Sequence, residues 1–358
     1  MERRRTRTVR VGNITIGGES RISIQSMTNT DTHNIDATYD QVMRLCEAGC
    51  DIVRITAPDL ESVKTFEALK TRGVTVPLVA DIHFNHEIAI ACANSGVDKI
   101  RINPGNIGND DRIAAVVEAC RKNATPIRIG VNSGSLEKHI LAKYGSPTAE
   151  ALAESALYHA SLLEKFDFHN VILSVKASTT RTMIGANRIL AAKTDYPLHL
   201  GVTEAGGGDS ALIKSGVGIG TLLAEGIGDT IRVSLTDDPV AEVYAAREIL
   251  KALELTDNGG MDIVSCPTCG RTKINLIPLL SEFKARVRAE GLDKYNLKVA
   301  LMGCVVNGPG EAREADLGIA GGVGEGLIFK KGEILRKVSE DRLIDELISE
   351  IKAYVNHP

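Results

Sequence analysis

The sequence predicts an α/β protein with an N-terminal (β/α)₈ TIM barrel and a second, smaller α/β domain. Short apolar segments alternate with helix-like segments up to about residue 255, a pattern typical of a parallel sheet. Eight such strands over roughly 250 residues favour a closed barrel over an open sheet. The polar, glycine-rich segment ELTDNGGMD (254–262) then separates this region from the rest of the chain.

The barrel elements follow one another with a regular βα period. Helix-like segments at 37–49, 110–123 and 148–166 lie between strands, and several end at Gly or Asn, a usual stop signal. The segment GVGIG (216–220) falls inside the seventh crossover, where it indicates helix packing or a tight turn rather than a dinucleotide site. The predicted strands are 21–27, 51–56, 77–84, 99–105, 126–132, 171–178, 198–203 and 230–235.

The domain boundaries follow from the change in composition. We expect a barrel domain over 1–256, a hinge at 257–261 and a second, small α/β domain over 262–358. The second domain opens with SCPTCG and continues with a helix (274–291), a strand (297–303), the glycine-rich GIAGGVGEG, LIFKKGEIL and a final amphipathic helix (339–355).

Charge and composition exclude several function classes. The chain has 358 residues, 43% of them hydrophobic, with a net charge of −4, which argues against nucleic-acid binding or a membrane-surface role. MERRRTRTVRVG lacks the apolar stretch of a secretory signal, and we interpret its five arginines as a solvated arm. No run approaches a membrane span, and seven cysteines are expected to be reduced thiols in the cytoplasm.

Each predicted strand presents one apolar and one polar face, because side chains alternate along a strand. In DIVRIT (51–56), Val53 and Ile55 share the apolar face and Arg54 lies on the other. The apolar faces should contact the helices, which leaves the polar faces pointing into the barrel. The polar-face side chains are Arg54, Asp81, His83, Arg101, Asn103, Arg128, Asn132, Ser174, Lys176, Ser178, His199, Thr203, Arg232 and Ser234.

The excess of cations among these side chains predicts an anionic ligand. An internal salt-bridge network is the alternative, but Asp81 and Glu204 are too few to neutralise four arginines and a lysine. Unpaired charges inside a barrel cost several kcal/mol each. We therefore expect a phosphate or diphosphate at the barrel mouth. We interpret four further histidines as surface residues of helices or loops rather than as ligands: His33, His86, His139 and His159.

Three cysteines suggest a metal centre in the second domain. Cys266 and Cys269 form a CxxC, and Cys304 follows after 34 intervening residues, a set that suits either zinc or an iron–sulfur cluster. The loop NGPGE could supply Glu311 as an oxygen ligand, which suits a [4Fe–4S] cluster with one exchangeable position; a surface glutamate is the alternative. The other four, Cys46, Cys50, Cys92 and Cys120, are expected to be buried thiols of the barrel helices or their ends.

Six motifs together resemble one family. IQSMTNTDT, ADIHF, RINPGN and GVTEAG in the barrel region, with SCPTCGRT and GCVVNGPGEA behind them, are similar to the 4-hydroxy-3-methylbut-2-enyl diphosphate synthases of the methylerythritol phosphate route to isoprenoids. The resemblance covers essentially the whole chain. The chain has no room for the extra middle domain of plant-type members, so it resembles the two-domain bacterial type.

The resemblance implies a reaction and its cofactor. Members open the ring of 2-C-methyl-D-erythritol 2,4-cyclodiphosphate by a two-electron reduction, with loss of a hydroxyl as water, giving (E)-4-hydroxy-3-methylbut-2-enyl diphosphate. Electrons come from a flavodoxin or ferredoxin. A substrate oxygen replaces the glutamate ligand of the [4Fe–4S] cluster. The implied cluster ligands are Cys266, Cys269, Cys304 and Glu311.

The resemblance also implies roles for the barrel and an assembly. Members are homodimers in which the cluster domain of one subunit closes over the barrel mouth of the other. Asp81, His83 and Glu204, together with Glu311, would orient hydroxyls or deliver a proton at the reacting carbons. The expected substrate-binding residues are Arg54, Arg101, Asn103, Arg128, Asn132, Lys176, Ser178, His199 and Arg232.

Two alternatives from other classes remain at this point. One is a redox-inactive barrel enzyme, such as an aldolase or a pterin-site transferase, with a zinc-stapled tail, which would leave Glu311 unexplained. The other is a non-catalytic electron carrier or iron–sulfur sensor, which would have no use for a cationic barrel interior. Metal analysis distinguishes the first from a cluster enzyme, and binding of a diphosphate would count against the second.

Overall fold

The computed structural model describes residues 2–256, 260–304 and 313–356. It divides the chain into two compact units, Met1–Thr256 and Asp257–Pro358. Each has its own core of buried apolar side chains. Among the described residues, no helix combines the length and apolarity needed to cross a bilayer.

The first unit is a parallel barrel, as predicted. Its eight strands are hydrogen-bonded in the order β8-β7-β6-β5-β4-β3-β10-β9, and a parallel bridge between Leu173 and Leu198 joins the two ends of that row. Several strands are shorter than the sequence suggested. Their bounds are β3 (Ser23–Met27), β4 (Ile52–Thr56), β5 (Leu78–Asp81), β6 (Lys99–Ile102), β7 (Ile127–Asn132), β8 (Val171–Lys176), β9 (His199–Leu200) and β10 (Thr230–Ile231).

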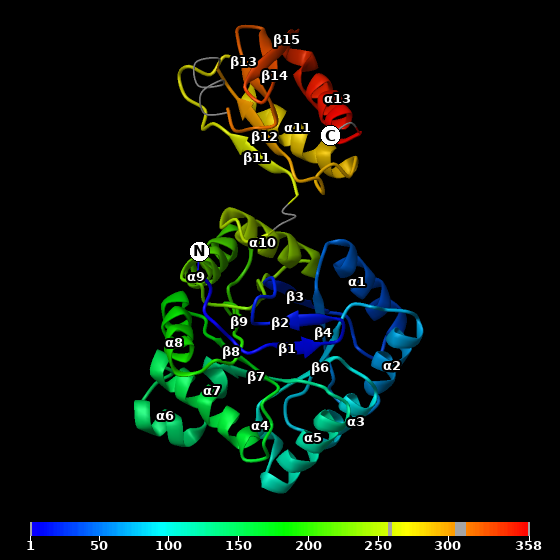
Figure 1. The fold of residues 1–358 in the computed structure, drawn as a ribbon, viewed down its shortest axis with the longest axis vertical. Helices are drawn as coiled ribbons and strands as arrows, with labels where there is room; N and C mark the ends of the chain where they lie inside the picture. Colours follow the sequence, from blue (N-terminus) through cyan, green and yellow to red (C-terminus); the bar gives the residue numbers. More distant parts are fainter. Residues whose placement is uncertain (1, 257–259, 305–312, 357–358) are drawn as a thin grey trace. The chain divides into compact units, whose positions relative to one another are not determined.

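Helices surround the strands as an outer ring (Figure 1). The glycines of GVGIG lie within α9, and a side chain at Gly218 would collide with Met183 and Val202, so that segment serves helix packing. The helices are α1 (Ile35–Glu47), α2 (Val63–Thr71), α3 (His86–Asn94), α4 (Pro104–Ile107), α5 (Asp110–Lys122), α6 (Lys138–Tyr144), α7 (Ala149–Glu164), α8 (Thr180–Lys193), α9 (Gly208–Ala224) and α10 (Pro239–Ala252), with a 3₁₀ turn at Ser133–Ser135.

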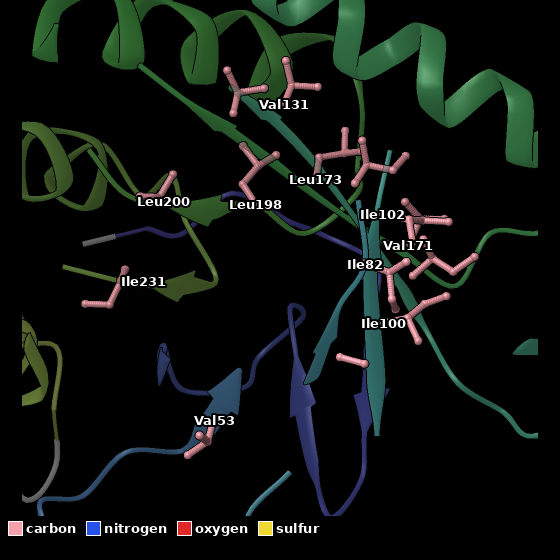
Figure 2. Close-up of a cluster of buried hydrophobic side chains, with 14 of the residues drawn as sticks. Val53, Ile82, Ile100, Ile102, Val131, Val171, Leu173, Leu198, Leu200 and Ile231 are labelled. Carbon is pink, nitrogen blue, oxygen red and sulfur yellow. The ribbon is translucent and has the colours of Figure 1, made fainter. Parts of the chain in front are cut away.

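The predicted alternation of strand faces is confirmed on the apolar side. Val53, Ile100, Ile102, Val131 and Leu173 belong to one large buried cluster between strands and helices, part of which is drawn in Figure 2. Each such side chain contributes about 1.5–3 kcal/mol by leaving water. Because this face is occupied by packing, the opposite face of the same strands must point into the barrel.

A β-hairpin that the sequence analysis missed packs against the amino ends of the strands. Strands β1 (Val9–Val11) and β2 (Ile14–Ile16) pair antiparallel. Their apolar side chains form one buried cluster with Ile52, Val79 and Ile172, which lie near the starts of β4, β5 and β8 on the inward face. The amino end of the barrel interior is therefore filled with apolar side chains.

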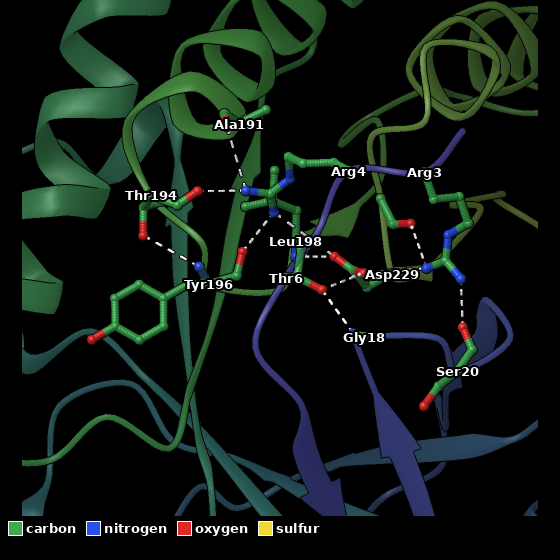
Figure 3. A network of polar contacts seen from close by, with 11 residues as sticks. Arg3, Arg4, Thr6, Gly18, Ser20, Ala191, Thr194, Tyr196, Leu198 and Asp229 are labelled. Carbon is green, nitrogen blue, oxygen red and sulfur yellow. Dashed lines mark hydrogen bonds and ion pairs between the residues drawn. The ribbon is translucent and has the colours of Figure 1, made fainter. Parts of the chain in front are cut away.

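The prediction of a solvated arginine arm is wrong for Arg3, Arg4 and Arg7. Arg3 Nη2 lies 3.2 Å from Oδ1 of Asp229, and Arg4 Nη2 donates to the carbonyl oxygen of Tyr196 at 2.7 Å (Figure 3). Arg7 pairs with Asp195 and stacks on the Tyr196 ring. The physical reason is that Asp229 is only 2% exposed at the start of β10, where an ionised carboxylate requires cationic partners.

In its described residues, the second unit has a five-stranded sheet and two α-helices. Strands β11 (Asp262–Ser265), β12 (Lys298–Met302) and β13 (Leu317–Gly321) are parallel, and β14 (Glu325–Lys330) and β15 (Glu333–Ser339) continue the sheet antiparallel. A 3₁₀ turn (Glu340–Arg342) precedes the last helix. The helices α11 (Leu276–Ala289) and α13 (Leu343–Asn356) contribute Phe283, Val287 and Leu347 to its core. The predicted α/β character of this region is confirmed.

Candidate active site

A polar cavity of about 110 Å³ lies among the carboxyl ends of the barrel strands. Carboxyl ends of barrel strands are where enzymes of this fold place their active sites. Five of the lining side chains are cationic, and one is a carboxylate. The cavity is lined by Arg54, Asp81, His83, Arg101, Arg128, Gly130, Asn132, Ser174, Lys176, Thr203 and Arg232.

Asp81 is the carboxylate of this cavity. Its Oδ1 lies 3.3 Å from Nη1 of Arg101, and its Oδ2 lies 4.0 Å from Nε of Arg54. Burial by itself would raise the pKa of Asp81, but attraction from Arg54, Arg101, His83 and Arg128 outweighs it and lowers that pKa to about 2. Asp81 is therefore ionised at neutral pH and can accept hydrogen bonds.

Arg128 is a buried cation of the site with few compensating contacts. It is 1% exposed, and its Nε and Nη1 have no hydrogen-bond partner among the residues that the structure describes. Burial, together with the neighbouring Arg54 and Arg101, lowers the pKa of Arg128. Because a guanidinium keeps its proton in proteins, this side chain presents buried, unsatisfied N–H donors that an anion could fill.

Arg54 and Arg232, which also line the cavity, have different neighbours. The Nε of Arg54 lies 3.1 Å from the Sδ of Met27, and burial lowers the pKa of Arg54 to about 10, so it remains cationic at neutral pH. Arg232 instead pairs with Glu242 of α10, with Nη2 2.9 Å from Oε1.

Glu242 is a residue that the sequence analysis missed. It is 3% exposed and also accepts hydrogen bonds from Ser26 Oγ at 2.8 Å and from the backbone N–H of Leu235 at 3.2 Å. The signal that could have found it is its position in α10, on the same buried face as Val243 and Ala246. An acidic residue on a core-facing helix stripe predicts a buried cation opposite it.

Two glycines make room for the long cations. A side chain at Gly130 would collide with the guanidinium of Arg101, whose Nη2 donates to the Gly130 carbonyl oxygen at 2.7 Å. At Gly201, a Cβ would lie 3.1 Å from Nζ of Lys176. The absence of side chains at these inward positions is what lets Arg101 and Lys176 occupy the interior.

Four predicted site residues do not line the cavity. Asn103 is buried and its Oδ1 accepts from the backbone N–H of Gly130 at 3.0 Å, so it braces β7. Ser178 and Glu204 are exposed in the loops after β8 and β9. His199 points into the barrel but is fully buried, outside the set of lining residues.

The histidines that we interpreted as surface residues need one correction. His33 and His139 are exposed and His86 is half-buried, but His159 is fully buried. Its Nδ1 accepts from the backbone N–H of Gly105 at 3.0 Å, and its Nε2 contacts the carboxylate of Glu137. The reason is that the loop after β6 approaches α7 closely enough to cover the imidazole.

In the second unit, Cys266 and Cys304 lie just after neighbouring parallel strands. Ser265 of β11 pairs with Leu301 of β12, and Cys266 directly follows the first of these strands. The Sγ of Cys266 accepts from the backbone N–H of Gly303 at 3.2 Å, next to Cys304. The backbone N–H of Lys273 donates to the carbonyl oxygen of Gly303 at 2.8 Å, which holds the CxxC loop against the end of β12.

These thiols suit a soft metal centre in their chemistry. All seven cysteines are free thiols, and the N–H of Arg271, then its side chain, hydrogen-bond Cys269 and lower the pKa of that exposed thiol. Cys46, Cys50, Cys92 and Cys120 are half-buried or buried in the barrel unit, as predicted. Among the described residues, no three side chains of the ligand-forming types converge on one point. Glu311 lies outside the described residues.

Solved structures with a similar fold support the barrel architecture. A type I 3-dehydroquinate dehydratase from Clostridium difficile matches with a TM-score of 0.51 and 17% identity, covering 70% of this chain and 97% of that one. A dihydropteroate synthase from Stenotrophomonas maltophilia matches with a TM-score of 0.50 and 16% identity, covering 69% and 98%. At this identity the likeness concerns the fold alone.

Sequence relatives cover the whole chain. A 4-hydroxy-3-methylbut-2-en-1-yl diphosphate synthase (flavodoxin) from Clostridium perfringens is 56% identical over 98% of this chain and 99% of its own. A protein of the same name from Fusobacterium nucleatum is 54% identical over 96% of both chains. The GcpE TIM-barrel domain matches residues 6–247, and the GcpE protein C-terminal domain matches residues 262–353. The chain therefore belongs to the GcpE family.

Proposed function

We propose that the chain catalyses the reductive ring opening of 2-C-methyl-D-erythritol 2,4-cyclodiphosphate to (E)-4-hydroxy-3-methylbut-2-enyl diphosphate. The observation that carries the proposal is the barrel cavity, where five cations face one carboxylate. The reaction consumes two electrons and two protons and releases one water. The names of its relatives, at 53–56% identity, support the same reaction.

The barrel residues would bind the diphosphate. Arg101, Arg128 and Lys176 face the same cavity from neighbouring strands β6, β7 and β8. Hydrogen bonds to a charged group contribute about 1.5–3 kcal/mol each, so a few of them give micromolar or tighter binding. Arg54 and Arg232 would close the other side, and Asn132 would add a neutral donor.

The carboxylate and the histidine of the cavity have different tasks. Because the pKa of Asp81 is lowered to about 2, it is ionised during the reaction and would accept a hydrogen bond from a substrate hydroxyl rather than donate a proton. His83, on the rim of the cavity, is then the better candidate to deliver a proton to the departing hydroxyl. Glu204 and Ser178, exposed in neighbouring loops, would act only if those loops close over the substrate.

Cys266, Cys269 and Cys304, with Glu311 as the fourth ligand, would hold a [4Fe–4S] cluster. Three free thiols in the segments that follow two adjacent strands are the donors that such a cluster requires. The cluster would supply the two electrons one at a time. A flavodoxin is the expected electron donor, because the relatives carry it in their names.

We also propose that the protein acts as a homodimer in the cytoplasm. The expected assembly brings the cluster domain of one subunit to the barrel mouth of its partner. Free cysteines throughout the chain suit a reducing compartment.

The test is the metal content of anaerobically purified protein, followed by an EPR spectrum with the cyclic diphosphate added. We expect about four iron and four sulfide per chain, as a single [4Fe–4S] cluster requires, and a spectrum that changes with substrate. Cys269→Ala should lose the cluster, whereas Cys92→Ala, a buried thiol of α3, is the matched control and should keep it. One zinc per chain without sulfide would overturn the redox proposal.

A further inference from the structure

A second polar layer lies beneath the cavity, inside the barrel. Lys99 precedes Arg101 by two residues on the same inward face of β6, which places it about 6–7 Å further down the strand. Its Nζ crosses the barrel interior to Oε1 of Gln25 on β3, at 3.3 Å. Ser23, two residues before Gln25 on β3, lies opposite Thr230 of β10, and Thr230 in turn lies opposite His199 of β9.

The polar atoms of this layer are buried and incompletely satisfied. Lys99 and His199 are both 0% exposed. Among the described residues, hydrogen-bond partners are lacking for Ser23 Oγ, Gln25 Nε2, Thr230 Oγ1 and both ring nitrogens of His199. The described part of the chain also offers Lys99 no carboxylate at ion-pair distance. Such a layer can hold ordered water, because its polar groups lack protein partners.

The charged surroundings of Lys99 are almost entirely cationic. Arg54 of β4, Arg128 of β7, Lys176 of β8 and His199 of β9 point into the same interior. The inward positions of β3 and β10 hold the neutral Ser23, Gln25 and Thr230, and the cationic Arg232 follows directly after β10. The carboxylate that acts on Lys99 is that of Asp98 in the loop before β6, and it is engaged by Lys70 and by the N–H of Leu78. Asp81 lies further along, beside Arg101.

This environment favours an uncharged lysine in the free protein. Burial, followed by the repulsion of Arg128 and Arg54, lowers the pKa of Lys99 well below its usual value. Burial also lowers the pKa of His199, with Arg128 and Lys176 as the next causes. A dianion bound in the cavity above would oppose the positive field that these groups experience, which favours the protonated forms.

We propose that Lys99 takes up a proton from solvent when a diphosphate binds in the cavity above it, so that ligand binding and charging of the buried layer occur together. The proton leaves a hydronium ion or a buffer acid of the solvent and bonds to the Nζ lone pair, and no bond of the ligand or of the protein breaks. The proposal rests on the proposed function, because it requires an anion in that cavity. Lys99 is thus a positioning residue that strengthens the field on the bound diphosphate without touching it.

The cyclic diphosphate is a clean probe for this uptake. Each phosphorus of the ring has one ester oxygen, one anhydride oxygen and one strongly acidic hydroxyl, so the ligand lacks the ionisation near pH 6 of a phosphate monoester. Protons taken up on binding near neutral pH therefore come to the protein. Lys176, which lines the cavity, is the second group that can accept one.

The experiment is calorimetric titration of the anaerobic, oxidised holoenzyme with the cyclic diphosphate, without reductant, in buffers of different ionisation enthalpy. The slope of binding enthalpy against buffer ionisation enthalpy gives the protons taken up. We expect Lys99→Met to lower that number by about one while the protein still binds the ligand. Lys64→Met, which removes an exposed lysine of α2 paired with Glu61, should leave the number unchanged.

The pH dependence of affinity gives an independent reading. Because the bound form carries the extra proton, affinity should fall as pH rises between 7 and 9, by up to about tenfold per pH unit for each proton taken up. Lys99→Gln, which keeps a polar group opposite Gln25, serves if Lys99→Met does not fold. Equal uptake in the unaltered protein and in a Lys99 variant, or no uptake at all, would overturn the inference. Absence of any binding would instead overturn the proposed function.

Discussion

The two ends of the barrel hold arginines in opposite environments. At the amino end, Arg3 and Arg4 meet the carboxylate of Asp229 and backbone carbonyls, beside an apolar plug formed by the hairpin β1–β2. At the carboxyl end, Arg128 has guanidinium nitrogens without partners in the described residues, and Asp81 is shared between Arg54 and Arg101.

We infer that the amino end contributes to the stability of the fold and the carboxyl end to ligand binding. At the amino end, ion pairs and hydrogen bonds offset part of the cost of burying Asp229 and fix the N-terminal segment against the barrel. Unsatisfied cations at the carboxyl end are costly in the free protein, and that cost is offset only when an anion arrives. Four experiments test whether the two ends differ in this way.

The largest effect is expected at the amino end. Asp229→Ala would leave Arg3 and Arg4 without their carboxylate and the backbone N–H of Leu198 without its 2.8 Å acceptor. Breaking a buried pair by removing one partner costs about 3–5 kcal/mol of unfolding free energy. Denaturant titration measures that loss, and affinity for the cyclic diphosphate should not change. Asp195→Ala, which removes the half-exposed partner of Arg7, is the control, with an expected cost of at most about 1 kcal/mol.

The carboxyl end should respond in the opposite sense. Arg128→Met removes donors to the ligand, so affinity for the cyclic diphosphate should fall about 100-fold, the equivalent of about 3 kcal/mol. Unfolding free energy should stay level or rise, because an uncompensated buried charge is lost. Arg188→Met, at a surface ion pair with Glu225, should change neither quantity. A variant at Arg128 that loses stability but keeps its affinity would contradict the comparison.

Ligand binding should stabilise the barrel through its carboxyl end alone. At a concentration one hundred times its dissociation constant, the cyclic diphosphate should add about 2.7 kcal/mol to the unfolding free energy. Scanning calorimetry would show this as a higher melting temperature. Asp229→Ala should keep the full increment, whereas Arg128→Met at the same ligand concentration should show little of it. Equal increments in both variants would place the ligand elsewhere.

The smallest effect concerns stability in acid. Protonation of the two buried aspartates is expected to change the free energy of unfolding in opposite directions. The folded-state pKa of Asp81 is lowered from 3.8 to about 2, so its contribution of about 2 kcal/mol is present above pH 4 and is lost as pH falls through 2. Burial raises the pKa of Asp229, so protonation of that group favours the fold as pH falls towards 4.

Urea titrations from pH 5 to pH 2 would compare Asp81→Asn with Asp229→Asn. The first variant should lose less stability in acid than the unaltered protein, and the second should lose more. If both variants changed the acid profile in the same direction, the two ends would not differ as described.

Local patterns in the sequence determined much of this protein. The βα period predicted the barrel, and the alternation in DIVRIT placed Arg54 inward, because strand geometry alone decides which side chains share a face. The same reasoning brought Asp81, Arg128 and Lys176 to the cavity. The CxxC with Cys304 drew attention to the second unit for a similar reason, since ligand type and spacing are local properties.

Only the tertiary structure decided how far along the barrel each inward residue lies and what it meets there. His199 has the same parity as the cavity residues but lies beneath them, because depth depends on strand register and not on alternation. Arg232 has its carboxylate on α10, and Arg4 has its partner at the start of β10, more than two hundred residues away. Such pairings depend on which segments the closed barrel brings together, and periodicity along the chain carries no information about them.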